Sequence, residues 1–214
     1  MRDRISRIVI VGGGSAGWLA AGVIAAEHRI DPQAQQPFEL VLVESPDVPT
    51  IGVGEGTWPS MRATLQRIGL SETDFIRECD ASFKQGTFFR SWHTGGGETY
   101  SHPFTVPTGY ADTNLVPHWL ALPDAPQFAD AVTPQTALFG DCLAPKQITT
   151  PEYAFVVNYG YHLDAGKFAD MLRQHCTEYL GVKHIKANVS QINAAENGDI
   201  QSVTTDPVSY THLT

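Results

Sequence analysis

Glycines with the spacing GxGxxG follow a short apolar run near the start of the chain. Residues 8–11 have the composition of a buried strand, and residues 18–24 have the apolar character of a helix. Gly12, Gly14 and Gly17 lie between these two segments. In such a turn the first glycine permits the tight bend, the second lets the backbone approach a pyrophosphate, and the third lets the helix pack against the strand. Backbone N–H groups at the helix start attract the phosphates. The predicted phosphate-binding residues are Gly12, Gly13, Gly14, Ser15, Ala16 and Gly17.

A carboxylate after the next apolar run supports this prediction. Residues 38–43 are expected to form a buried strand, and Glu44 follows at its carboxyl end, where it could accept a hydrogen bond from a ribose 2′-OH. Glu44 comes slightly later than is typical, which we attribute to the polar insert 31–37. The alternative is a glycine-rich turn that binds nothing, and the presence of both features disfavours it.

Length, charge and cysteine content restrict the class of protein. The 214 residues suffice for one or two domains, and a net charge of −9 argues against a nucleic-acid or membrane-surface partner. No run approaches the ~18 apolar residues of a membrane span, and the start of the chain leads directly into a strand, so a cytoplasmic location is expected. Cys79, Cys142 and Cys176 show no CxxC pairing, which indicates buried apolar side chains and neither disulfides nor a metal site.

The rest of the chain mixes short elements with long loops. Helices are predicted over 59–68, from Ser71 as an N-cap, and from Asp164 as an N-cap to Gly181. Strands are predicted over 82–92, and over 182–192 and 200–205 on either side of an Asn197-Gly198 turn. Residues 94–151 are rich in proline and are expected to form long loops with short helical pieces, a type of segment that often carries function.

Three segments together resemble the flavin-dependent tryptophan and indole halogenase family, over about residues 8–205. They are the glycine turn 12–18, the segment Gly-Val-Gly-Glu-Gly-Thr-Trp-Pro at 52–59, and Ser-Phe-Lys at 82–84. The resemblance implies an α/β fold with an FAD-binding, Rossmann-like parallel sheet of the glutathione-reductase type. A β-hairpin would be added to this sheet, and the chain would be truncated before the sheet is completed.

The resemblance also implies a flavin-binding strap at 52–59. Val53, Gly54 and Gly56 would contact the flavin, and Glu55 is interpreted as a residue that holds the strap through backbone hydrogen bonds. Gly56 and Trp58 replace the commoner Ala and Ile, which leaves the indolic substrate open between tryptophan and free indole.

A catalytic lysine follows from the same resemblance. In the family, FADH2 from a separate flavin reductase and O2 oxidise chloride or bromide to hypohalous acid, which reaches a lysine beside the substrate. Lys84 matches that lysine, and a desolvated amine suits the role. Without the resemblance Lys84 would be interpreted as a solvated strand lysine. His102 and Phe104 correspond to residues that stack on the indole, although a solvent-exposed loop histidine is an equal alternative for His102. His118, Trp119, Tyr161 and His162 are interpreted as packing residues.

The resemblance divides residues 1–206 into three parts. They are a dinucleotide-binding unit with strap and lysine strand at 1–93, substrate-side loops at 94–160, and a return helix and hairpin at 161–206. Residues 207–214 look like a translated sequencing adaptor and are interpreted as a non-native tail. The family's sheet-closing glycine strand, Trp-x-Trp-x-Ile-Pro segment and glutamate partner of the lysine are not found. We therefore expect the N-terminal part of a longer enzyme, inactive by itself, whose full-length form is a candidate homodimer.

Two other functions stay open. The parent enzyme could be a flavin monooxygenase that hydroxylates its substrate, or the chain could be a non-catalytic nucleotide-binding module. Hydroxylation does not need Lys84, and an isolated module would leave apolar strand edges unpaired. Halogenation is the function that the sequence favours.

Overall fold

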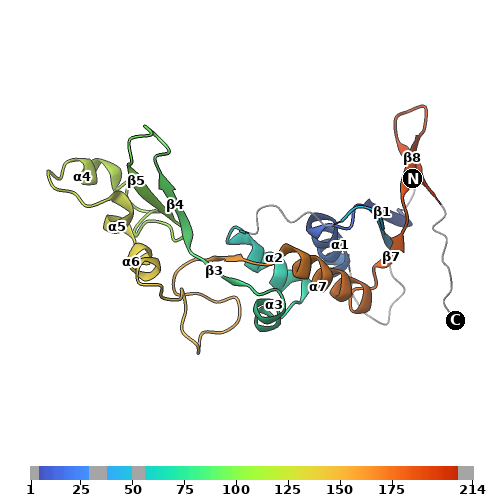
Figure 1. Ribbon diagram of the computed structural model, residues 1–214, viewed down its shortest axis with the longest axis horizontal. Helices are drawn as coiled ribbons and strands as arrows, with labels where there is room; N and C mark the ends of the chain where they lie inside the picture. The colour runs from blue at the N-terminus through green and yellow to red at the C-terminus, as the bar shows by residue number, and fades with distance from the viewer. Residues whose placement is uncertain (1–4, 29–37, 50–55, 207–214) are drawn as a thin grey trace.

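A three-stranded parallel sheet forms one end of the molecule (Figure 1). The computed structural model describes residues 5–28, 38–49 and 56–206. The sheet contains β1 (Arg7–Val11), β2 (Glu39–Glu44) and β7 (Lys183–Lys186), in the order β1-β2-β7. Helices α1 (Ser15–His28) and α7 (Ala165–Glu178) pack against each other beside the sheet. The predicted α/β class with a parallel sheet is confirmed.

The sequence of strand β2 is a continuous apolar run because both faces of the strand are buried. Leu40 and Leu42 belong to the main core, with the fully buried Trp18 of α1 and Leu172 of α7. On the opposite face Val41 and Val43 pack against the chain that follows β7. Strand β1 pairs only with β2 among the described strands, and two of its valines are exposed.

The two predicted helix caps of this region are present. Ser71 begins α3 (Glu72–Glu78) and accepts a hydrogen bond from the backbone of Asp74 at 3.2 Å. Asp164 begins α7 and accepts one from the backbone of Lys167 at 2.9 Å. Before both caps in the chain, α2 (Ser60–Ile68) ends at Gly69, whose φ of 83° is a left-handed conformation that glycine adopts without strain.

The single strand predicted over 82–92 is wrong, because it divides into two strands with different partners. β3 (Ser82–Lys84) pairs antiparallel with β6 (Gly160–His162), whereas β4 (Gly86–Arg90) pairs antiparallel with β5 (Thr99–Pro103). A Cβ on Gly86 would lie 2.5 Å from the His102 carbonyl oxygen, so the chains meet closely where the pairing changes. Hydrophobic alternation cannot reveal this division, since it carries no information about distant partners.

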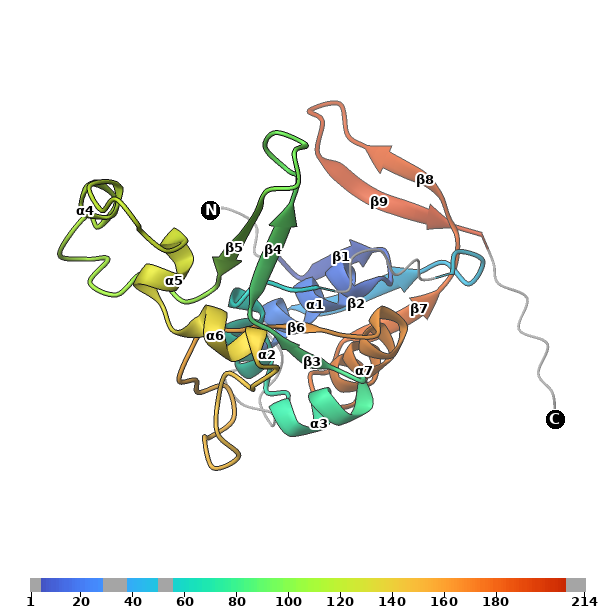
Figure 2. The ribbon, with the colours of Figure 1, turned by 60° about the vertical axis from the view of Figure 1, so that its left-hand side comes forward.

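The predicted strand 182–192 likewise divides. Its first half is β7 of the parallel sheet, and its second half is β8 (Val189–Ala194), which forms a two-stranded hairpin with β9 (Ile200–Thr205). Gly198 in the connecting turn has a φ of 88°, as the Asn-Gly signal predicts. The hairpin projects beyond the parallel sheet (Figure 2).

Long loops with short helices occupy the other end of the molecule, as predicted (Figure 1). The helices are α4 (Val116–Leu120), α5 (Phe128–Val132) and α6 (Gln135–Gly140), and strand β5 within these loops was not predicted. Cys79 and Cys176 are buried as expected, whereas Cys142 is exposed, which corrects that prediction. Among the described residues, no helix has the length and apolar character needed to cross a membrane.

A buried carboxylate connects α3 to the segment that leads into β6. Glu72 accepts hydrogen bonds from Lys146 Nζ at 2.7 Å, from the hydroxyls of Tyr159 and Tyr161 at 2.5 and 2.7 Å, and from the Tyr153 backbone at 2.7 Å. Burial alone would raise the pKa of Glu72, but these hydrogen bonds outweigh burial and hold that pKa below its usual value. The charged carboxylate therefore stabilises the folded chain at neutral pH.

Replacing this carboxylate is expected to destabilise the protein in a pH-dependent way. Glu72→Gln leaves the ammonium of Lys146 without its counter-charge, at a cost of about 3 kcal/mol at pH 7. The pKa of Glu72 is lower in the folded than in the unfolded state. The carboxylate therefore stabilises the fold fully at pH values above its unfolded-state pKa of about 4.3, and this stabilisation is lost as the pH falls through its folded-state pKa. Urea unfolding should show a wild-type advantage at pH 7 that shrinks below pH ~4. The exposed Glu196→Gln is the control, and equal midpoints at pH 7 would contradict the prediction.

Candidate functional site

The turn between β1 and α1 requires glycine at two positions. Gly12 has a φ of 121°, and its N–H donates to the carbonyl of Val43 at 2.8 Å, which joins the turn to β2. A Cβ on Gly17 would lie 2.0 Å from the Gly12 carbonyl oxygen, so the helix packs directly on the turn. The predicted strand–turn–helix geometry is therefore present.

The two glycines between them have different surroundings. A Cβ on Gly13 would lie 2.2 Å from Cδ of Glu44, so the Glu44 carboxyl group occupies the space that a side chain would need. Around Gly14, in contrast, no atom lies within 4 Å of a Cβ position. The backbone at Gly14 therefore borders open space.

That space is a cavity of about 1010 Å³ at the carboxyl ends of β1 and β2. Its volume is at the upper end of the range for small-molecule sites, which suits a ligand as large as a dinucleotide. The predicted residues that line it are Gly12, Gly13, Gly14, Ser15, Ala16, Glu44 and Gly56. Gly17 packs beneath the turn and is not in the lining, and Val53, Gly54 and Glu55 lie outside the described residues.

A second cavity of about 490 Å³ lies on the side of the proline-rich loops. His102 and Phe104 both line it, together with residues of the 127–133 segment. The Phe104 side chain is buried, and its ring centroid lies 5.5 Å from that of Trp58, whereas His102 is exposed. Trp58 lines both cavities and is 60% exposed. Trp58 is therefore a wall that the two cavities share.

The half-buried Lys84 places its amine near this shared wall. Its Nζ lies 5.8 Å from the ring centroid of Trp58 and 5.6 Å from that of Phe104. A Cβ on Gly56 would lie 3.1 Å from the same Nζ, so glycine at this position leaves the amine room. The isolated bridge between Gly56 and His162 holds these segments side by side. The fold thus brings Lys84 and Phe104 together with a glycine and a tryptophan of the predicted strap.

Sequence reasoning missed His162 as a neighbour of the lysine. A Cβ on Gly56 would lie 3.5 Å from His162 Nδ1, close to the lysine amine. The packing interpretation is right for Tyr161, which is fully buried, and wrong for His162, which is exposed. Alternation along β6 places the two side chains on opposite faces, so strand periodicity was the available signal.

A glycine turn at the carboxyl ends of parallel strands, beside a dinucleotide-sized cavity, defines the class of nucleotide-binding α/β proteins. The chain belongs to the tryptophan halogenase family, whose model matches residues 7–210. The tryptophan 7-halogenase RebH of Lentzea aerocolonigenes is 31% identical, and the tryptophan 6-halogenase ThaL of Streptomyces albogriseolus is 32% identical, each over 96% of this chain. A solved tryptophan halogenase from Shewanella frigidimarina is 50% identical over 96% of this chain, with a TM-score of 0.89.

These relatives are much longer than this chain. The chain spans about 40% of the length of the two curated relatives and about 40% of the solved Shewanella chain. The cavities and the lysine described above lie within the shared part.

Proposed function

We propose that the protein containing this chain is a flavin-dependent halogenase of an indolic substrate, tryptophan or free indole. The observation that carries the proposal is the position of the Lys84 amine beside Trp58, which borders both a dinucleotide-sized cavity and an aromatic cavity. An oxidised halogen formed in the first cavity would pass this amine before it reaches a substrate in the second.

The residues of the first cavity fit FAD. Gly14 leaves the turn open to an approaching phosphate, and the N–H groups from Gly13 to Ala16 begin α1, where an anion is favoured. Glu44 would accept a hydrogen bond from the ribose, and Val53, Gly54 and Gly56 would contact the flavin. When bound, FAD that a separate reductase has reduced would react with O2, and this reaction would oxidise chloride or bromide to hypohalous acid.

The lysine and the aromatic residues would then direct the halogen. The Lys84 amine either donates a hydrogen bond to hypohalous acid or is itself halogenated, and both require an amine on a flexible stem. His102 and Phe104 would stack on the two faces of the indole, an arrangement that suits an electron-rich ring. Phe104 is already packed against Trp58, so Trp58 forms a further apolar wall.

The test is a product assay on the full-length enzyme. FAD, a flavin reductase with NADH, oxygen and bromide are supplied with tryptophan or with indole, and products are identified by mass spectrometry. We expect a brominated product with the paired bromine isotope pattern. A hydroxylated product without halogen would instead establish a monooxygenase, and a protein that binds flavin without any turnover would establish a binding module.

A further inference from the structure

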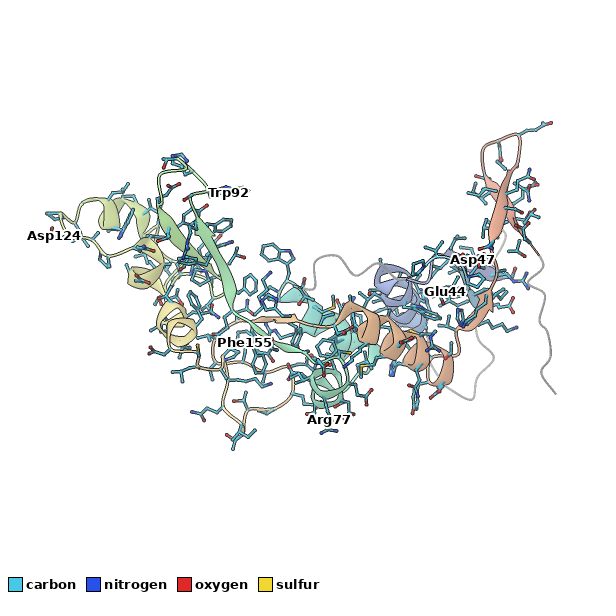
Figure 3. All side chains as sticks on the ribbon, viewed as in Figure 1. Glu44, Asp47, Arg77, Trp92, Asp124 and Phe155 are labelled. Atoms are coloured by element: carbon cyan, nitrogen blue, oxygen red, sulfur yellow. The ribbon has the colours of Figure 1, made fainter. Side chains whose placement is uncertain are left out.

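The carboxyl group of Glu44 lies between the glycine turn and a histidine of β7. On one side it fills the space next to Gly13, where a Cβ would be 2.5 Å from Oε1. On the other side its Oε2 lies 2.7 Å from Nε2 of His184. Figure 3 labels Glu44 at the sheet end of the molecule. The carboxylate is therefore flanked by two residues, neither of which is its neighbour along the chain.

The parallel sheet itself brings His184 to this place. His184 is in register with Leu42, and Lys186 with Glu44, so His184 and Glu44 stand two positions apart on one face of the sheet. Trp18 of α1 is fully buried and packs edge-on against the imidazole, with 5.0 Å between ring centroids. The side chain of His184 is only 14% exposed, so its ring is held in position.

The surroundings of His184 favour its neutral imidazole. Burial lowers the pKa of His184, and the charges of Lys186 and Arg173 lower it further, against the opposing effect of Glu44. A neutral imidazole has one N–H, which at Nε2 would point to Glu44. Among the described residues, neither Glu44 Oε2 nor His184 Nε2 has a well-aligned hydrogen-bond partner, although the two atoms lie at hydrogen-bond distance.

We propose that His184 is a positioning residue for the nucleotide: it holds Oε2 of Glu44 so that Oε1 accepts the ribose hydroxyl. The proposal rests on the ribose contact assigned to Glu44 under the proposed function. Without His184, Oε2 would be a buried acceptor with no donor, and the carboxylate would turn toward water and away from the ribose. His184 is not among the residues that line either cavity.

The test compares the affinities of two nucleotides for wild type and for a His184 variant. Binding is measured by calorimetry on the full-length enzyme without flavin. ADP and 2′-deoxy-ADP serve as ligands, and His184→Phe keeps a ring against Trp18 while it removes the donor. We expect wild type to bind ADP about tenfold more tightly than 2′-deoxy-ADP, and His184→Phe to bind the two almost equally. His184→Gln, whose amide N–H can reach Oε2, should restore at least a threefold preference for ADP. His184→Leu serves as a second apolar variant if the Phe variant does not fold.

Other outcomes overturn the proposal in distinguishable ways. If His184→Phe weakens ADP and 2′-deoxy-ADP by the same factor, His184 only packs against Trp18. If wild type itself does not distinguish the two nucleotides, the ribose contact of Glu44 fails and the proposal fails with it. FMN, which lacks the adenosine half, should bind wild type and His184→Phe equally, and a weaker affinity of the variant for FMN would show a general disturbance of the site.

Discussion

Lys84→Ala in the full-length enzyme is expected to lose halogenated product by at least about a hundredfold while it still consumes reduced flavin and oxygen. The reason is spatial: under the proposed function the halide would be oxidised in the first cavity, whereas Lys84 Nζ lies 5.8 Å from the ring centroid of Trp58, a side chain that lines both cavities. Product is measured by mass spectrometry with bromide and indole or tryptophan, and flavin reoxidation is followed by absorbance in the same samples. The two activities should separate.

Two variants control for charge and for the loss of a lysine. Lys84→Arg keeps the positive charge, but its guanidinium stays protonated and is a poor nitrogen nucleophile, so product should stay low. Lys167→Ala removes an exposed lysine that pairs with Asp80 and lines neither cavity, and this variant should retain product. Retained halogenation in Lys84→Ala would refute the catalytic role, and equal loss of both activities would indicate misfolding.

Gly14→Val is expected to abolish FAD retention, with at least about a hundredfold loss of affinity, in a protein that still folds. No atom lies within 4 Å of a Cβ at Gly14, so the chain tolerates the side chain, yet that side chain would stand where a phosphate must approach the backbone. Flavin absorbance of the purified protein and fluorescence titration with FAD measure the loss. Circular dichroism and the melting temperature report on folding.

Two other glycine substitutions provide controls. Gly17→Ala places a Cβ 2.0 Å from the Gly12 carbonyl oxygen, so this variant should lower the melting temperature itself. Gly140→Val, at an exposed position with open space around it, should change neither property. Normal FAD binding by a folded Gly14→Val protein would refute the phosphate site at this turn.

Features that depend on neighbours in the chain could be predicted from the sequence. The glycine turn at 12–17, the N-caps Ser71 and Asp164 and the turn at Gly198 each result from the conformational preferences of a few adjacent residues. The predicted strand that ends before Glu44 also follows locally, since a strand buried on both faces shows an unbroken apolar run. The assignment to the family rested on such local motifs.

Features that depend on long-range pairing could not be predicted in this way. Strand periodicity is the same whichever partner a strand has, so it did not show that 82–92 and 182–192 each divide between two sheets. The position of His162 beside the lysine and of His184 beside Glu44 both result from such pairing. Neither histidine carries a local motif.

The sequence by itself therefore determined the glycine turn, the position of the carboxylate Glu44 at the end of a strand and, through the resemblance to the family, Lys84 as the candidate lysine. Only the tertiary structure decided that the lysine amine lies beside Trp58, which lines two cavities, and that Glu44 lies between Gly13 and His184. The physical reason is that turns and caps are stabilised by contacts within a few residues. Cavities and buried side-chain pairs form only when strands far apart in the sequence come together around one core.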